Sequence, residues 1–70
     1  MRVTKRDLQS VTRGGLAFTI PKGSETLPIP WDEARVWIAP ATFDSNSIEH
    51  HNAEYYGVAI FIEETEESDT

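Results

Sequence analysis

The stretch "GLAFTIPKGSETLPI", residues 15–29, predicts two extended segments joined by a tight turn. Apolar residues alternate with small or polar ones, which is the period of a strand that buries one face. The alternating residues are Leu16, Phe18 and Ile20 in the first segment and Leu27 and Ile29 in the second. The Pro-Lys-Gly between them favours a turn, because proline presets φ and glycine suits the turn's end. Pro28 lacks a ladder donor, so the second segment belongs at a sheet edge or its pairing stops there.

Two later segments continue the extended pattern. Val36 and Ile38 share one face of a strand, and Arg35 and Trp37 share the other. Both faces of residues 55–62 are apolar, so we expect this strand to be central or covered on both sides. A glycine inside that strand, Gly57, indicates a bulge, a sharp barrel bend or a close backbone approach.

Short strands at about ten-residue spacing, divided by proline and glycine, are typical of a small β domain. We therefore predict a mostly β fold over residues 1–63, a small antiparallel sheet or SH3-like barrel of about four to five strands. The expected core residues are Leu16, Phe18, Ile20, Leu27, Ile29, Val36, Ile38, Val58, Ile60 and Ile62, with Trp31 or Trp37 closing one end. Near the N-terminus, Thr4 and Asp7 have capping-box spacing and favour a short helix. A short edge strand at residues 2–4 followed by a loop is the alternative.

The charge is distributed unevenly along the 70 residues, whose net charge is −6. Six bases and four acids give +2 over residues 1–35, whereas eight acids and no base give −8 over residues 36–70. This balance disfavours direct nucleic-acid binding, which requires Lys and Arg to neutralise phosphates. It permits a protein partner with a basic surface. Residues 64–70 contain no apolar side chain, so we expect a disordered acidic tail.

The absence of cysteine excludes disulfides and thiolate zinc sites. The charged N-terminal residues do not resemble a signal peptide, and the longest apolar run is too short to cross a bilayer. We therefore expect a cytoplasmic protein without a membrane segment.

Two adjacent histidines, His50 and His51, lie between Glu49 and Glu54 and raise the question of a metal site. Adjacent strand residues point to opposite faces, and no third ligand stands at a recognisable spacing. The serines lack a nucleophile-elbow context, and the glycines form no phosphate-binding loop. We therefore expect no metal, no cofactor, no catalytic residue and no enzymatic activity.

An aromatic side chain beside an arginine on one strand face is a typical interface anchor, so Trp37 and Arg35 are candidates for binding a partner. The alternative is that Trp37 covers a second apolar cluster with Tyr55 and Phe61. Residues 41–54 have no sustained period and read as a long loop, the kind of segment that often carries function. The candidate partner-binding residues are Arg35, Trp37, Phe43, Asp44, Glu49, His50, His51 and Glu54.

The stretches "FTIPKGS" and "YYGVAIFIEETEE" resemble a class of short phage-encoded proteins that have an early hairpin and a final Y-G-V-x-I strand. Such chains are similar to small SH3-like barrels, and the resemblance covers residues 16–29 and 52–64. It implies a β fold and a phage origin, and hence the host cytoplasm. It implies no catalytic residue.

The function expected from these features is that of a phage accessory protein, a non-enzymatic module that binds a host or phage protein. One alternative is an acidic inhibitor that mimics nucleic acid on a host enzyme. Such a mimic would align Asp32, Glu33, Asp44, Glu49, Glu54 and Glu63 in a row. The other alternative is a structural subunit that self-associates through an edge strand.

Overall fold

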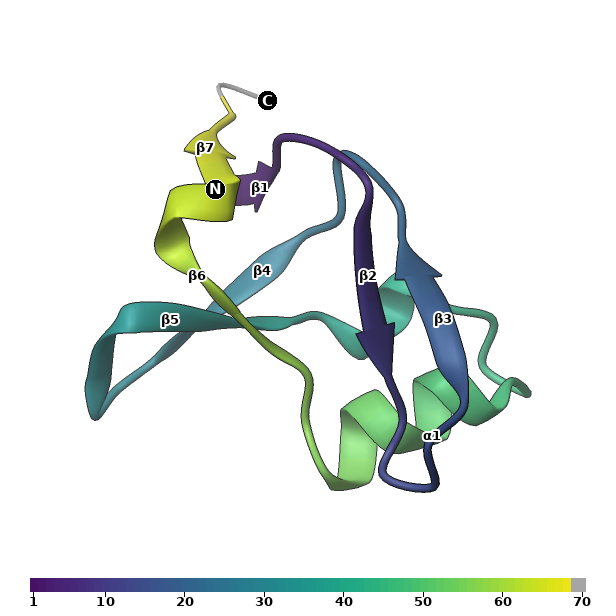
Figure 1. Ribbon diagram of the computed structural model, residues 1–70. Helices are drawn as coiled ribbons and strands as arrows, with labels where there is room; N and C mark the ends of the chain where they lie inside the picture. Colours follow the sequence, from purple (N-terminus) through teal and green to yellow (C-terminus); the bar gives the residue numbers. More distant parts are fainter. Residues whose placement is uncertain (69–70) are drawn as a thin grey trace.

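The computed structural model describes residues 1–68, which form three small antiparallel sheets, one α-helix and two 3₁₀ turns (Figure 1). The strands are β1 (Arg2–Thr4), β2 (Leu8–Val11), β3 (Ala17–Ile20), β4 (Thr26–Ile29), β5 (Asp32–Ile38), β6 (Ala59–Phe61) and β7 (Thr65–Glu67). The helix is α1 (Ile48–Tyr55), and the 3₁₀ turns are η1 (Pro40–Thr42) and η2 (Ile62–Glu64). The predicted class, a mostly β fold of small antiparallel sheets, is confirmed, although residues 1–68 contain seven short strands where four to five were expected. Within residues 1–68 the sheets do not close into a barrel.

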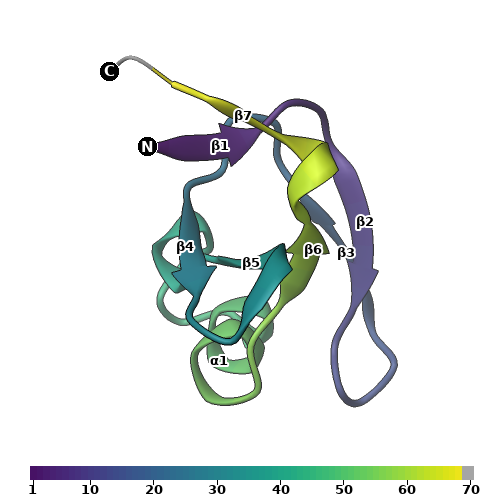
Figure 2. The same ribbon diagram turned by 90° about the vertical axis from the view of Figure 1, so that its left-hand side faces the viewer.

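The largest sheet has the strand order β4-β5-β6, and the other two pair β1 with β7 and β2 with β3 (Figure 2). β5 is therefore the central strand, and β4 is an edge strand, as Pro28 predicts. A register shift between Pro28 and Ile29 interrupts the pairing of β4 with β5.

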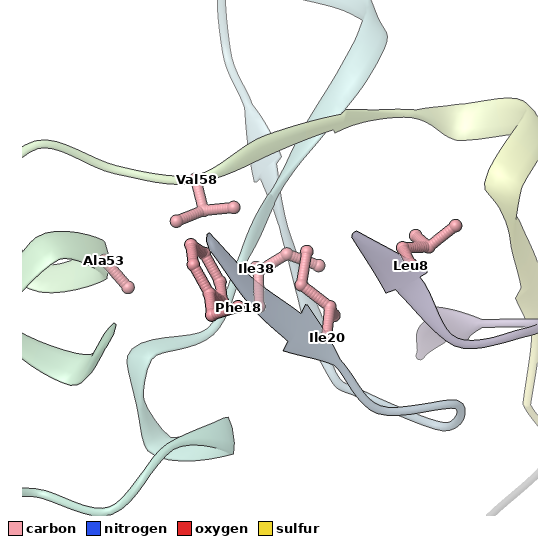
Figure 3. Close-up of a cluster of buried hydrophobic side chains, with 6 residues drawn as sticks. All are labelled: Leu8, Phe18, Ile20, Ile38, Ala53 and Val58. Atoms are coloured by element: carbon pink, nitrogen blue, oxygen red, sulfur yellow. The ribbon is translucent and has the colours of Figure 1, made fainter. Parts of the chain in front are cut away.

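The core lies between the β2–β3 sheet, the inner face of β5 and α1. Figure 3 shows its main cluster, which consists of Leu8, Phe18, Ile20, Ile38, Ala53 and Val58. Ile20 and Ile38 are the most deeply buried apolar side chains, with 0% and 1% exposed. Of the residues predicted for the core, Phe18, Ile20, Ile29, Val36, Ile38 and Val58 are buried. Ile60 and Ile62 are only half-buried, and Leu16, Leu27 and Trp31 are exposed.

The predicted N-terminal helix is wrong, because strands β1 and β2 occupy that region. The two residues of the expected capping box bind the Pro-Lys-Gly turn instead. The Thr4 hydroxyl donates to the carbonyl of Pro21 at 2.9 Å, and the Asp7 carboxylate accepts from the amide of Lys22 at 2.7 Å. Distant partners thus replace the local helix cap.

The turn at residues 21–24 does not close a hairpin. β3 pairs with β2 and β4 pairs with β5, so the turn passes the chain from one sheet to another. It is held against β1, where the backbone of Thr4 bonds to Gly23 and Ser24 at 2.9 and 3.0 Å. The pattern therefore predicts the turn and both strands, but not which strands pair.

The predicted loop over residues 41–54 is also wrong, because η1 and α1 fill most of it. Ser47 caps α1 by accepting a hydrogen bond from the amide of His50 at 3.1 Å. Glu49 lies in the first turn, where the helix dipole favours a carboxylate. No helix within residues 1–68 is long and apolar enough to cross a membrane.

Residues 55–62 are not one central strand. Tyr55 ends α1, and only Ala59–Phe61 form a strand, β6, at the edge of its sheet. Tyr55 and Phe61 are 70% and 61% exposed, which shows that one of the two apolar faces lacks cover. Gly57 turns the chain between the helix and the strand with φ of 84°.

The predicted disordered tail is wrong for residues 64–67, because η2 and β7 include them. β7 pairs with β1, and the Thr65 hydroxyl accepts from Arg2 at 3.0 Å. The Arg6 guanidinium pairs with Glu64 at 2.7 Å. The acidic end of the chain therefore binds its basic start, which gives the uneven charge distribution an internal role. Residues 69–70 of the predicted tail lie outside the described residues.

Candidate functional site: an aromatic face on the three-stranded sheet

The outer face of the β4-β5-β6 sheet gathers apolar side chains from three strands. Leu27 and Ala59 lie directly opposite Trp37 on the two neighbouring strands, and Phe61 lies opposite Arg35. Directly opposed residues of an antiparallel pair share one face of the sheet. We call this surface, together with the adjacent Trp31, the aromatic face. It consists of Leu27, Trp31, Trp37, Ala59 and Phe61.

The aromatic face is open to solvent. Trp31 is 77% exposed, Phe61 61% and Leu27 48%. Contiguous apolar patches on a monomer, as opposed to scattered residues, mark sites of interaction. The large rings supply most of this surface, and such rings dominate the energetics of many interfaces.

Trp37 is the fixed centre of the aromatic face. Its ring packs on Gly57 so closely that a Cβ atom there would lie 2.6 Å from Cζ3 of the ring. Trp31 stands edge-on to Trp37, with ring centroids 6.4 Å apart and an interplanar angle of 72°. Tyr55 and Tyr56 line an adjoining hollow of about 340 Å³ with Trp37. Of the three alternatives predicted for Gly57, the structure shows a close approach to its backbone, made by the indole ring of Trp37.

Both expectations for Trp37 contain part of the observed arrangement. The residue lies on one face with Arg35, and it also contacts apolar neighbours, but it is only half-buried. Such a half-buried, immobilised ring presents surface to a partner at low entropic cost.

The charged groups beside the aromatic face leave it with an acidic rim. Arg35 is held by Asp32, with 2.7 Å between Nε and Oδ2. The hydrogen bond from Arg35, and then that from the amide of Ala34, lower the pKa of the Asp32 carboxyl. Glu33 lies in β5 two residues before Arg35, and Glu63 follows Phe61 by two residues; both are exposed and form no ion pair among residues 1–68. The cation beside the face is thus paired, whereas two carboxylates are free.

Two residues of the predicted 41–54 site have structural roles. Phe43 stacks edge-on against Phe18 at a centroid distance of 5.5 Å and packs on the core. The Asp44 carboxylate accepts from the amide of Asn46 at 3.0 Å, and its carbonyl accepts from the Ser47 hydroxyl at 2.6 Å. These contacts form the turn that precedes α1.

The histidines and the remaining acids are spread around α1. Nδ1 of His50 lies 2.9 Å from the carbonyl oxygen of Pro40, and Nε2 lies 2.8 Å from the carboxylate of Glu54. His51 stacks on Tyr55, with ring centroids 4.5 Å apart. In the described part of the chain no group of three potential metal ligands converges. The predicted site residues therefore do not form one surface.

Four residues of the aromatic face, Leu27, Trp31, Ala59 and Phe61, were not among the predicted site residues. Their alternation and aromatic character were visible, but apolar side chains at strand spacing predict a core as readily as an open face. No protein-family model, curated protein or solved structure matches this chain.

Proposed function

We propose that this protein is a non-enzymatic interaction module that binds another protein through the aromatic face. The observation that carries the proposal is the exposed ring of Trp31 and that of Phe61 beside the anchored ring of Trp37. Interface energy concentrates in a few large aromatic side chains near the centre of a contact. A partner that covers these rings would remove apolar surface which the chain itself leaves in water.

The rim of the aromatic face defines the chemistry of the partner. Glu33 and Glu63 offer free carboxylates, and the whole chain carries a net charge of −6. A partner with an apolar centre and a basic rim would match this surface, and its charges would speed association.

We also propose a phage accessory role in the host cytoplasm. This part of the proposal rests on the resemblance of residues 16–29 and 52–64 to short phage-encoded proteins.

The nucleic-acid mimic has less support than the interaction module. Three of the acids that would form a mimic bind groups of their own chain, since Asp32 pairs with Arg35, Asp44 caps a turn and Glu54 contacts His50. A mimic needs such carboxylates to be free and aligned. Self-association through an edge strand remains the other alternative, because β6 has only one neighbour in its sheet.

Affinity capture from host lysate tests the aromatic face directly. Phe61→Ser removes an exposed ring, and Val11→Ser is the matched control, because both side chains are 61% exposed. We expect capture of one protein by the wild type and by Val11→Ser, at about 0.1 M and about 0.5 M salt, and its loss with Phe61→Ser. Equal capture by all three proteins would overturn the proposal. Capture that tolerates Phe61→Ser but disappears at high salt would favour the mimic.

A further inference from the structure

We propose that the partner adds an extended segment to β6 as a further antiparallel strand, in the groove between β6 and β2. This inference rests on the proposed function, because it names the kind of segment that the interaction module would bind. Strand addition obtains its affinity from main-chain hydrogen bonds and its specificity from alternate side chains.

The register of β5 and β6 shows which backbone groups of β6 are free. The amide of Ile38 donates to the carbonyl of Val58 at 2.8 Å, so these two residues form a hydrogen-bonded pair. Such pairs alternate along an antiparallel ladder, and the next one in this register joins Val36 and Ile60. The N–H and C=O groups of Ala59 and the N–H of Phe61 therefore point away from β5. The carbonyl of Phe61 is not free, because Phe61 is the N-cap of η2 and an N-cap carbonyl accepts the first hydrogen bond of its helix. For the three outward groups of Ala59 and Phe61, no backbone partner lies within residues 1–68.

β2 presents a second free edge to the same groove. The amide of Thr12 donates to the carbonyl of Leu16 at 2.8 Å, which fixes the hydrogen-bonded pairs of β2 with β3. By the same alternation, the backbone groups of Gln9 point away from β3. Residues 6–9 and residues 59–61 line the same groove, which has a volume of about 410 Å³. The ion pair between Arg6 and Glu64 also borders it.

The opposite edge of the sheet differs in every respect that matters for strand addition. β4 carries Pro28, which has no amide hydrogen to offer. The Thr26 hydroxyl of β4 donates to the carbonyl of Arg2 at 2.7 Å, and β1 lies beside it. Natural sheets protect their edges with such devices. β6 contains neither a proline nor a charged residue, and no described strand pairs with its outer edge.

The side chains around the groove define the segment that fits. Leu8 and Ile60 pack in or against the core on the inner side, so inward-pointing residues of the guest strand should be apolar. Outward-pointing residues would lie beside Phe61 and near the free carboxylate of Glu63. Basic residues suit that position through charge and through contact with the aromatic ring. The inferred ligand is an extended segment in which basic and apolar residues alternate.

A synthetic peptide, acetyl-Lys-Val-Lys-Val-Lys-Val-Lys-amide, tests this inference on the full chain. In a titration followed by amide NMR, we expect saturable binding and slower hydrogen exchange at Ala59 and Phe61. The guest amides that face β6 belong to the outward lysines, because directly opposed residues share a face. Methylation of the backbone amide nitrogens of the lysines should therefore weaken binding about tenfold or more. A peptide with the same residues in two blocks, four Lys then three Val, is the control for charge alone.

A variant of the protein tests the same hydrogen bonds from the other side. Ala59→Pro removes an outward amide and no bond to β5, and Pro28 shows that this sheet accepts proline at such a position. We expect Ala59→Pro to keep a cooperative thermal unfolding transition and to bind the peptide about tenfold more weakly. Ala59→Ser should bind as the wild type does.

Failure of this inference is distinguishable from failure of the proposed function. If the N-methylated and block peptides bind as well as the parent, or if no peptide binds, strand addition is overturned while the Phe61→Ser capture experiment decides the aromatic face. Protection of Ala59 that grows with protein concentration in the absence of peptide would assign this edge to a second copy and would also overturn the inference.

Discussion

Val36 and Trp37 are neighbours in β5, yet they meet opposite surroundings. Val36 points into the core and is 6% exposed, and Ile38, on the same face of β5, is 1% exposed. Trp37 points to the outer face, where Trp31 and Phe61 are 77% and 61% exposed. The outer face also carries several large apolar side chains, so apolar character alone does not decide which face is covered. So short a chain buries a limited fraction of its surface, and here the β2–β3 sheet and α1 cover one side only.

The largest contrast between the two faces should appear when one apolar side chain is truncated on each. Ile38→Ala leaves a cavity in the main core cluster and should lower the free energy of unfolding by about 2–5 kcal/mol. Leu27→Ala removes a side chain that is 48% exposed and should cost less than about 1 kcal/mol. Urea unfolding of both variants measures the difference. Equal losses would mean that the outer face is covered in solution.

The next effect concerns the glycine that supports Trp37. Gly57→Ala would place a Cβ atom 2.6 Å from the Trp37 ring at a backbone φ of 84°. We expect a loss of about 2–4 kcal/mol, from left-handed backbone strain together with overpacking. Gly23→Ala is the matched control, because Gly23 has φ of 85° but no atom within 4 Å of the added Cβ.

Since the control has strain without a clash, it should lose only about 1–2 kcal/mol. The excess loss of Gly57→Ala, accompanied by a change in tryptophan fluorescence, would report the contact with Trp37. If the two variants lose the same free energy, the ring moves aside without cost and Trp37 is not a rigid anchor.

These contrasts show which parts of the fold the sequence could predict. Alternation located the strands around Phe18 and Ile38, and the proline at position 28 identified an edge. Both signals act within one strand, where the side-chain period and the missing donor are local properties. Partners in the sheets depend on contacts distant in sequence, such as Thr4 with Pro21, which replaced the expected helix cap.

The candidate site was predictable in part for the same reason. The strand period correctly placed Trp37 and Arg35 on the face opposite Val36. It could not show that this face stays open, so Leu27 was assigned to the core and Phe61 to a second cluster. The helix α1 was missed although Ser47 is a good N-cap, because the polar residues around it resemble a loop in composition.

A smaller effect on stability is expected where the aromatic face itself is altered. Phe61→Ser should change the free energy of unfolding by no more than about 0.5 kcal/mol, because the ring is 61% exposed and contributes little to the core. Urea unfolding alongside Ile38→Ala measures this directly. A loss comparable to that of Ile38→Ala would show that Phe61 supports the fold. The loss of capture by Phe61→Ser would then follow from unfolding and not from the missing ring.

The smallest effect should come from the ion pair beside the aromatic face. The hydrogen bond from Arg35 is the largest cause that lowers the pKa of Asp32 in the folded chain. A carboxyl with a lowered folded-state pKa stabilises the fold above its unfolded-state pKa, near 3.8, and loses that contribution as the pH falls through the folded-state value. Arg35→Gln should therefore raise the NMR titration midpoint of Asp32 and slightly reduce the dependence of stability on acidic pH.

Arg6→Gln is the control for this prediction, because Arg6 lowers the pKa of a different carboxyl, that of Glu64. It should raise the midpoint of Glu64 and leave that of Asp32 unchanged. Both pairs are exposed, so added salt should diminish both effects. If Arg35→Gln leaves the Asp32 midpoint unchanged, Arg35 is not held by Asp32 in solution. The rim of the aromatic face would then carry a free cation, and a partner with a basic rim would no longer be the best match.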